Sequence, residues 1–151
     1  MSPKFVLLVF GVIAVSLGSI SAYSDEERTK IYSSMLPHIL QCSNEYGITE
    51  DELKASKEAG TFGAINPCFM GCVFKKIDVI NKEGMFSVEK AEKLSENFLV
   101  HDEDKKKASA VIKACATVND ESVSDGEKGC DRAKLLFECL LPFRQQFIKT
   151  R

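Results

Sequence analysis

Apolar residues recur along the chain with the period of α-helices. From residue 25 onward they return every three or four positions, so each segment has one apolar and one polar face. The first such face carries Ile31, Met35, Ile39 and Cys42. No segment shows the strict alternation that is typical of a half-buried β-strand. The pattern therefore predicts an all-α fold of about six helices.

Capping residues indicate where these helices begin. Residues 24–27 and 49–52 each form a capping box, in which Ser or Thr is followed three positions later by Glu. Asn66 stands before a proline at the first helical position, and Ser87 and Asp125 are further cap residues. The helices are thus predicted to begin near residues 25, 50, 67, 88, 104 and 126, and those after the first to end near residues 60, 80, 98, 118 and 141.

Two prolines interrupt the helical pattern. Pro37 lies inside the first predicted helix, and we expect it to kink or split that helix because proline removes a backbone hydrogen bond. Pro142 is expected to stop the last helix and leave a short tail. In that tail, Phe143, Phe147 and Ile148 would either fold over the protein as a lid or fray.

The segment over residues 67–80 is the most apolar of the predicted helices. At 100° per residue, its apolar positions cover about two thirds of the helix circumference. A helix this apolar has to be covered on more than one side. We therefore expect it to lie at the centre of the fold.

The first 22 residues have the layout of a secretory signal peptide. Lys4 gives a basic start, residues 5–17 form an apolar run of 13, and the small residues GSISA follow. Cleavage after Ser21 or Ala22 would leave about 129 residues as one secreted helical domain, residues 23–151. The alternative, a membrane anchor, needs a longer apolar run of roughly 18 to 20 residues.

Composition and charge exclude several classes of protein. The chain has 151 residues, of which 44% are apolar, so it suits one folded domain and is too apolar for disorder. Its formal charge of −2 argues against nucleic-acid binding, which needs a clustered basic surface. No stretch after residue 22 is long enough for a membrane span, so we expect no stable membrane insertion.

The six cysteines point to disulfides, because an even number of cysteines in a secreted chain is normally oxidised. Zinc is the competing interpretation, but no Cys-x-x-Cys pair occurs, so we expect no metal and no cofactor. Helix geometry restricts the pairing. Cys130 and Cys139 would lie about 13.5 Å apart along one helix, and Cys68 and Cys72 would share a face with parallel side chains. Excluding both pairs leaves ten of the fifteen possible pairings open.

The order of the cysteines is distinctive as a whole. It is Cys42-x25-Cys68-x3-Cys72-x42-Cys115-x14-Cys130-x8-Cys139, behind a signal peptide. This order resembles that of the six-cysteine insect odorant-binding proteins, of the pheromone and general odorant-binding type, and the resemblance covers nearly the whole mature chain. It implies three interlocked disulfides, namely Cys42–Cys72, Cys68–Cys130 and Cys115–Cys139. All three belong to the ten pairings that helix geometry leaves open.

The resemblance implies a secreted carrier with about six helices around an apolar cavity. Such a carrier binds a small hydrophobic, odorant- or pheromone-like molecule and transports it through extracellular fluid, such as sensillum lymph, to an odorant receptor. Large, adaptable apolar side chains would line the cavity. The candidates are Met35, Phe62, Phe69, Met70, Phe74, Ile77, Phe86, Leu94, Phe98, Ile112, Phe137 and Leu140. For each of them, an ordinary packed core is the alternative.

Some of these positions match the family more closely. Met35, Met70, Phe74 and Leu140 stand at fixed offsets from cysteines and correspond to wall positions in moth pheromone-binding members. Phe86 lies in a loop that forms part of the pocket mouth in those relatives. Moth members that release ligand in acid carry histidines in that loop and a longer acidic tail. This chain has neither, which puts that release mechanism in doubt.

Other function classes are weaker or remain as alternatives. An enzyme would need a nucleophile elbow such as Gly-x-Ser-x-Gly or a His-Asp-calcium arrangement, and the sequence has neither, so we expect no catalysis. A secreted helical interaction protein with a dry core, and a carrier of non-olfactory lipids or signals, stay open. The expected state is a monomer or weak homodimer. His38 is expected to be a buried, hydrogen-bonded histidine, His101 a solvated helix cap, and residues 105–107 an exposed basic helix face.

Overall fold

The computed structural model describes residues 25–59 and 65–147. This part of the chain forms six α-helices and two short 3₁₀ helices, and it contains no β-strand, so the predicted all-α fold is confirmed. The helices are Asp25–Tyr46 (α2), Glu50–Glu58 (α3), Pro67–Lys76 (α4), Val88–Phe98 (α5), Asp102–Cys115 (α6) and Cys130–Phe147 (α7), with 3₁₀ helices Ala116–Asp120 (η2) and Gly126–Lys128 (η3). The predicted signal peptide lies outside these residues. None of the described helices combines the length and the apolar character needed to cross a membrane.

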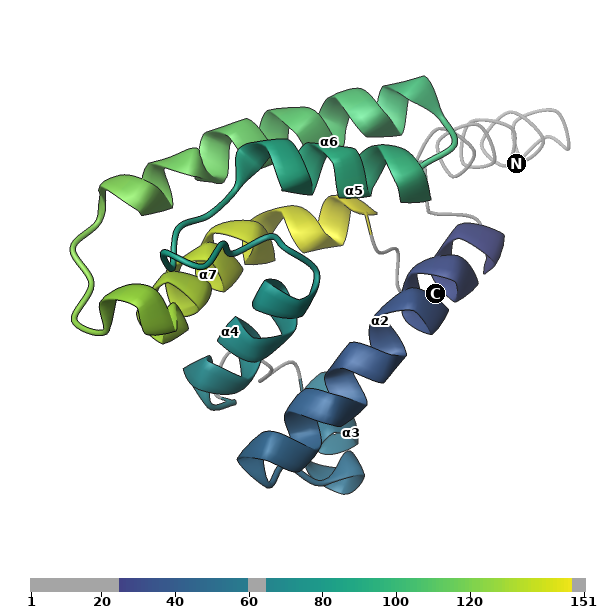
Figure 1. Ribbon diagram of the computed structural model, residues 1–151. Coiled ribbons are helices and arrows are strands. Elements are labelled where there is room, and N and C mark those ends of the chain that lie inside the picture. The colour runs from purple at the N-terminus through teal and green to yellow at the C-terminus, as the bar shows by residue number, and fades with distance from the viewer. Residues whose placement is uncertain (1–24, 60–64, 148–151) are drawn as a thin grey trace, which may run out of the picture.

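The helices pack around α4 and α7. In Figure 1, α5 and α6 run side by side, α7 lies beneath them, α4 lies against α7, and α2 slants along the side of the molecule with α3 near its lower end. Helix α4 packs against both α7 and α2, as its apolar circumference predicts. Its Phe69, Met70 and Val73 are all buried. The hydrophobic core therefore lies between α4 and the helices around it.

Helix α4 is shorter than predicted. It ends at Lys76, and Ile77 forms its C-cap. Asp78 then takes a left-handed backbone with φ of 62°, and this turns the chain out of the helix. Val79 and Ile80 still reach the core, because the chain folds back as a hairpin and not because the helix continues. The prediction that this apolar segment is buried is therefore confirmed for Val79 and Ile80. The prediction that it is helical beyond Lys76 is wrong.

The predicted caps are present where the structure describes them. Thr49 and Glu52 form the reciprocal capping box of α3, with the Thr49 N–H donating to the Glu52 carboxylate at 2.7 Å. The Asn66 side chain accepts from the Cys68 N–H, and the Ser87 hydroxyl accepts from the Lys90 N–H. The other capping box involves Ser24, which lies outside the described residues.

Of the two outcomes predicted at Pro37, splitting of the helix is wrong, and so is the prediction that Pro142 stops the last helix. Helix α2 runs unbroken through Pro37 for 22 residues. Pro37 and Ser33, whose carbonyl loses its usual helical partner, are both exposed, so water can satisfy that carbonyl. Helix α7 likewise continues through Pro142 to Phe147, so residues 143–147 are helical and do not form a separate tail. Ile148 lies outside the described residues.

The other helix boundaries differ from prediction in two places. Helix α6 begins two residues earlier than predicted, at Asp102, and its last predicted turn is the 3₁₀ helix η2. Helix α7 begins later than predicted, at Cys130, because the short helix η3 intervenes after Asp125. Asp125 nevertheless acts as the cap of α7 from five residues away, as the next section describes.

Candidate functional site: a disulfide-braced apolar interior

The residues predicted to line a pocket lie inside the fold. Eleven of the twelve are in the described part of the chain, and all eleven are buried or half-buried. The buried ones are Phe69, Met70, Phe86 and Ile112; the half-buried ones are Met35, Phe74, Ile77, Leu94, Phe98, Phe137 and Leu140. The twelfth, Phe62, lies outside the described residues.

Ten of these eleven side chains belong to a single hydrophobic cluster or pack against it. They come from α2, α4, α5, α6, α7 and the segment between α4 and α5, so segments far apart in sequence contribute to one interior. We call this cluster the apolar interior. The cluster also contains buried residues that were not predicted to line a pocket, among them Val73, Val79, Ile80, Ala133 and Leu136. Their periodic spacing marks them as core but gives no means of separating a packed position from a ligand-facing one.

Three disulfides brace the apolar interior, and they are the pairs that the family resemblance implies. Cys42–Cys72 joins α2 to α4, Cys68–Cys130 joins α4 to α7, and Cys115–Cys139 joins α6 to α7. Their Cα–Cα distances are 5.9, 4.3 and 5.8 Å, within or close to the range that a disulfide spans. Helix α7 is thus held at its first residue, Cys130, and near its middle, at Cys139.

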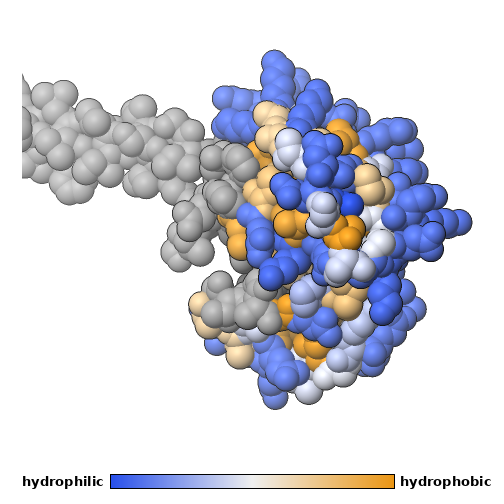
Figure 2. Space-filling model, turned by 90° about the vertical axis from the view of Figure 1, so that its left-hand side faces the viewer, coloured by the Kyte–Doolittle hydropathy of each residue, from blue (hydrophilic) through white to orange (hydrophobic). Residues whose placement is uncertain are grey.

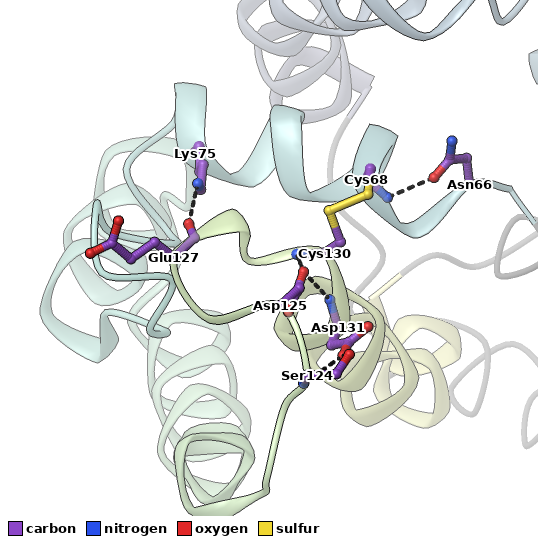
Figure 3. Close-up of a disulfide and its surroundings, with 8 residues drawn as sticks. All are labelled: Asn66, Cys68, Lys75, Ser124, Asp125, Glu127, Cys130 and Asp131. Atoms are coloured by element: carbon purple, nitrogen blue, oxygen red, sulfur yellow. Dashed lines mark hydrogen bonds between the residues drawn. A yellow bond between two sulfur atoms is a disulfide. The ribbon is translucent and has the colours of Figure 1, made fainter.

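A cluster of polar bonds fixes the start of α7 beside the Cys68–Cys130 disulfide (Figure 3). The Asp125 carboxylate accepts from the N–H groups of Cys130 and Asp131, at 2.7 and 3.2 Å, and so caps the helix. The Asp131 carboxylate in turn accepts from the N–H and the hydroxyl of Ser124. Lys75 of α4 donates to the Glu127 carbonyl at 2.6 Å. The disulfide and these bonds join α4, η3 and α7 into one unit.

The two hydrogen bonds from Ser124 lower the pKa of Asp131. The bond from the Ser124 hydroxyl has the larger effect, and the bond from the Ser124 N–H has the smaller one. Both bonds favour the charged carboxylate, so their contribution to stability is present at neutral pH and is lost as the pH falls through the lowered pKa. We predict that Ser124→Ala raises the pKa of Asp131 toward its ordinary value, as followed by NMR titration of the carboxyl carbon.

Glu52 is the matched reference in this titration. Its pKa is also lowered, by the Thr49 backbone N–H and hydroxyl, and it lies in α3, outside the unit that Ser124 belongs to. Its titration should not change in Ser124→Ala. An unchanged pKa at Asp131, or equal shifts at Asp131 and Glu52, would show that the hydroxyl of Ser124 is not the cause.

The other polar candidates are the two histidines and the cysteine pair beside Glu45. His101 is exposed and is the N-cap residue of α6 without a side-chain capping bond. His38 is half-buried on α2. The sulfurs of Cys42 and Cys72 lie near the Glu45 carboxylate, but they are bonded to each other and so are not thiolates that could hold a metal ion.

One face of the molecule is mostly polar. On the face shown in Figure 2, hydrophilic residues cover most of the area, and hydrophobic residues show in smaller areas between them. The large apolar side chains that are exposed among the described residues are Tyr32, Leu40, Tyr46 and Val100. Most of the large apolar side chains among the described residues therefore lie in or against the apolar interior.

Comparison with known proteins adds a family match. The sequence model of the PBP/GOBP family matches residues 24–142. The chain is also similar to General odorant-binding protein 19d of Drosophila melanogaster, with 28% identity over 137 residues, which cover 89% of this chain and 85% of that protein. No solved structure matches at a significant level.

Proposed function

The chain belongs to the PBP/GOBP family, and from this membership we propose that it is a secreted carrier of small hydrophobic molecules. The proposed cargo is odorant- or pheromone-like, and the proposed binding site is the apolar interior. Delivery would be to an odorant receptor across extracellular fluid such as sensillum lymph. The proposed role is binding and not catalysis, and the proposed state is a monomer or weak homodimer.

One observation carries the proposal, namely that Met and Phe side chains meet in the apolar interior. Met35, Met70, Phe69, Phe74 and Phe137 are buried or half-buried there. Methionine and phenylalanine side chains adapt to varied shapes, which suits a site for a class of ligands more than for one ligand. The three disulfides support it, because cross-links can offset packing contacts that a ligand cavity removes.

The physical size of such a ligand sets the expected affinity. Burying about ten CH₂ groups at roughly 0.8 kcal/mol each contributes about 8 kcal/mol to binding. Association costs several kcal/mol, and packing with one or two hydrogen bonds offsets part of that cost. The expected dissociation constants are therefore on the order of micromolar.

Displacement of a fluorescent probe tests the proposal directly. Purified protein should enhance the fluorescence of N-phenyl-1-naphthylamine at about micromolar concentration, and volatile alcohols, esters or aldehydes should displace the probe. Failure of both would contradict a carrier and favour a secreted helical interaction protein with a dry core. Native mass spectrometry of protein purified from the source tissue would distinguish odorants from non-olfactory lipids or signals as cargo.

A substitution of Ile112 separates a ligand cavity from a solid core. Ile112 is only 8% exposed, so a larger side chain at this position has no easy route into solvent. If the apolar interior holds a cavity, Ile112→Phe should fill part of it, weaken probe binding about tenfold and change the free energy of unfolding by less than about 1 kcal/mol. If the core is solid, overpacking should destabilise the protein by about 1–3 kcal/mol.

The control for this substitution is Tyr32→Ala, on the outside of α2, where the side chain is 59% exposed. It should leave probe binding unchanged. A loss of stability in Ile112→Phe together with unchanged probe affinity would place the ligand elsewhere and contradict the proposed site.

A further inference from the structure

The segment between α4 and α5 folds as a tight hairpin over residues 79–87. The Ser87 N–H donates to the Val79 carbonyl at 2.8 Å, and the Asn81 N–H donates to the Met85 carbonyl at 2.9 Å. These two bonds flank an antiparallel bridge between Ile80 and Phe86. In a pair of this kind the bonds run on either side of the paired residues. The N–H and carbonyl of Phe86 therefore point away from the hairpin and need partners elsewhere.

Asn119, in the 3₁₀ helix η2, supplies both partners. Its side-chain oxygen accepts from the Phe86 N–H at 2.8 Å, and its side-chain NH₂ donates to the Phe86 carbonyl at 2.9 Å. The carboxamide thus takes the place of a neighbouring strand for this one residue. Phe86 itself is only 5% exposed and belongs to the apolar interior. A side chain 33 residues away in sequence therefore sets the backbone of a residue in the proposed binding site.

Helix α7 fixes η2 in turn. Arg132 is 5% exposed, and its guanidinium donates to the carbonyls of Val118 and Glu121, on either side of Asn119. The same guanidinium lies 3.6 Å from the sulfur of Met85, the residue before Phe86. The hairpin is thus connected to the disulfide-bonded helix α7 through η2.

We propose that Asn119 is a positioning residue which, by holding the Phe86 backbone at both its N–H and its carbonyl, sets the length of ligand that the apolar interior accepts. This inference rests on the proposed carrier function and deepens it. Phe86 would act as a fixed wall. Asn119, which touches no ligand, would determine where that wall stands.

The test measures selectivity and not affinity alone, because a merely structural role would weaken all ligands alike. Displacement of N-phenyl-1-naphthylamine by 1-octanol and by 1-dodecanol gives a ratio of two dissociation constants for each variant. In Asn119→Ala the wall is released, so 1-dodecanol should bind more tightly relative to 1-octanol. The ratio of the two dissociation constants should change by about fivefold or more. The matched control is Asn44→Ala, at an exposed asparagine on α2, which should keep the wild-type ratio.

A second pair of variants tests the route through Phe86. Phe86→Leu should shift the ratio in the same direction, and adding Asn119→Ala to it should produce a smaller further shift than in the wild-type chain, because a smaller side chain then stands on the released backbone. If Asn119→Ala fails to fold, Asn119→Asp takes its place, because one carboxylate oxygen still accepts from the Phe86 N–H while the other stands against the Phe86 carbonyl and repels it.

The outcomes separate the inference from the function on which it rests. A wild-type ratio in Asn119→Ala or its Asp substitute, or a shift in the Phe86→Leu background as large as in the wild-type chain, would overturn the positioning role while leaving the carrier function in place. If the wild-type chain binds neither the probe nor the alcohols, the carrier function fails, and the role of Asn119 fails with it.

Discussion

Replacing Cys68 and Cys130 together by alanine is expected to lower the free energy of unfolding by about 4 kcal/mol. This bridge closes the longest loop of the three, with a sequence separation of 62 residues, and cross-linking a longer loop restricts the unfolded chain more. Alanine is chosen because Cys130 is 8% exposed and a serine there would bury a hydroxyl. Urea unfolding followed by circular dichroism measures the loss.

The same double substitution at Cys115 and Cys139 is the comparison. Its separation is 24 residues, so loop entropy alone predicts a loss of about 3.4 kcal/mol, which is smaller than at Cys68–Cys130. The reverse order would mean that lost packing at Cys115, which is fully buried, outweighs the restriction of the unfolded chain. A loss below about 1 kcal/mol at Cys68–Cys130 would contradict a bracing role for that bridge.

Much of the fold could be predicted from local sequence signals. Helix periodicity and caps such as Thr49 and Ser87 act within a few residues, so they report the start of a helix wherever it lies in the fold. The apolar circumference of α4 predicted contacts on several sides, and α4 packs against both α2 and α7. Helix geometry reduced the number of disulfide pairings but did not choose among the rest, because it constrains only cysteines that share a helix.

The errors come from effects that depend on the surroundings of a residue. Proline at position 37 does not end the helix because water reaches the carbonyl that it leaves unpaired. Pro37 and Ser33 are both exposed, on the side of α2 opposite Met35. The turn at Asp78 converts a predicted last helical turn into a hairpin. The bonds from Asn119 to Phe86 cross 33 residues and follow no periodic pattern, so no sequence signal points to them.

The proposed site shows the same division. The sequence placed eleven described candidates inside the protein, because burial follows from apolar character and spacing. It did not indicate which polar residues hold that interior in shape. Arg132 and Asn119 contact the hairpin from other parts of the chain, so their role depends on tertiary packing.

Substitution of Gly84 by alanine is the second change with a large expected effect. Gly84 lies in the hairpin with φ of 77°, and an added Cβ would stand 2.2 Å from the Gly126 carbonyl oxygen and 3.2 Å from the Glu127 Cα. Both are backbone atoms of η3, so the clash cannot be relieved by the movement of a flexible side chain. The backbone of η3 is itself held by the bonds around the start of α7. We expect a loss of about 3 kcal/mol or more in the free energy of unfolding, from left-handed backbone strain together with overpacking.

Gly47 provides the matched control, since it has φ of 65° and nothing within 4 Å of an added Cβ. Gly47→Ala carries the backbone strain alone and should cost about 1 kcal/mol. The difference between the two variants then isolates the contact between the hairpin and η3. Equal losses would mean that the hairpin can move away from η3 at little cost. The hairpin would then be held only by Asn119 at Phe86 and by Arg132 at Met85. A larger loss at Gly84 would instead make η3 a third support of the wall that Phe86 forms.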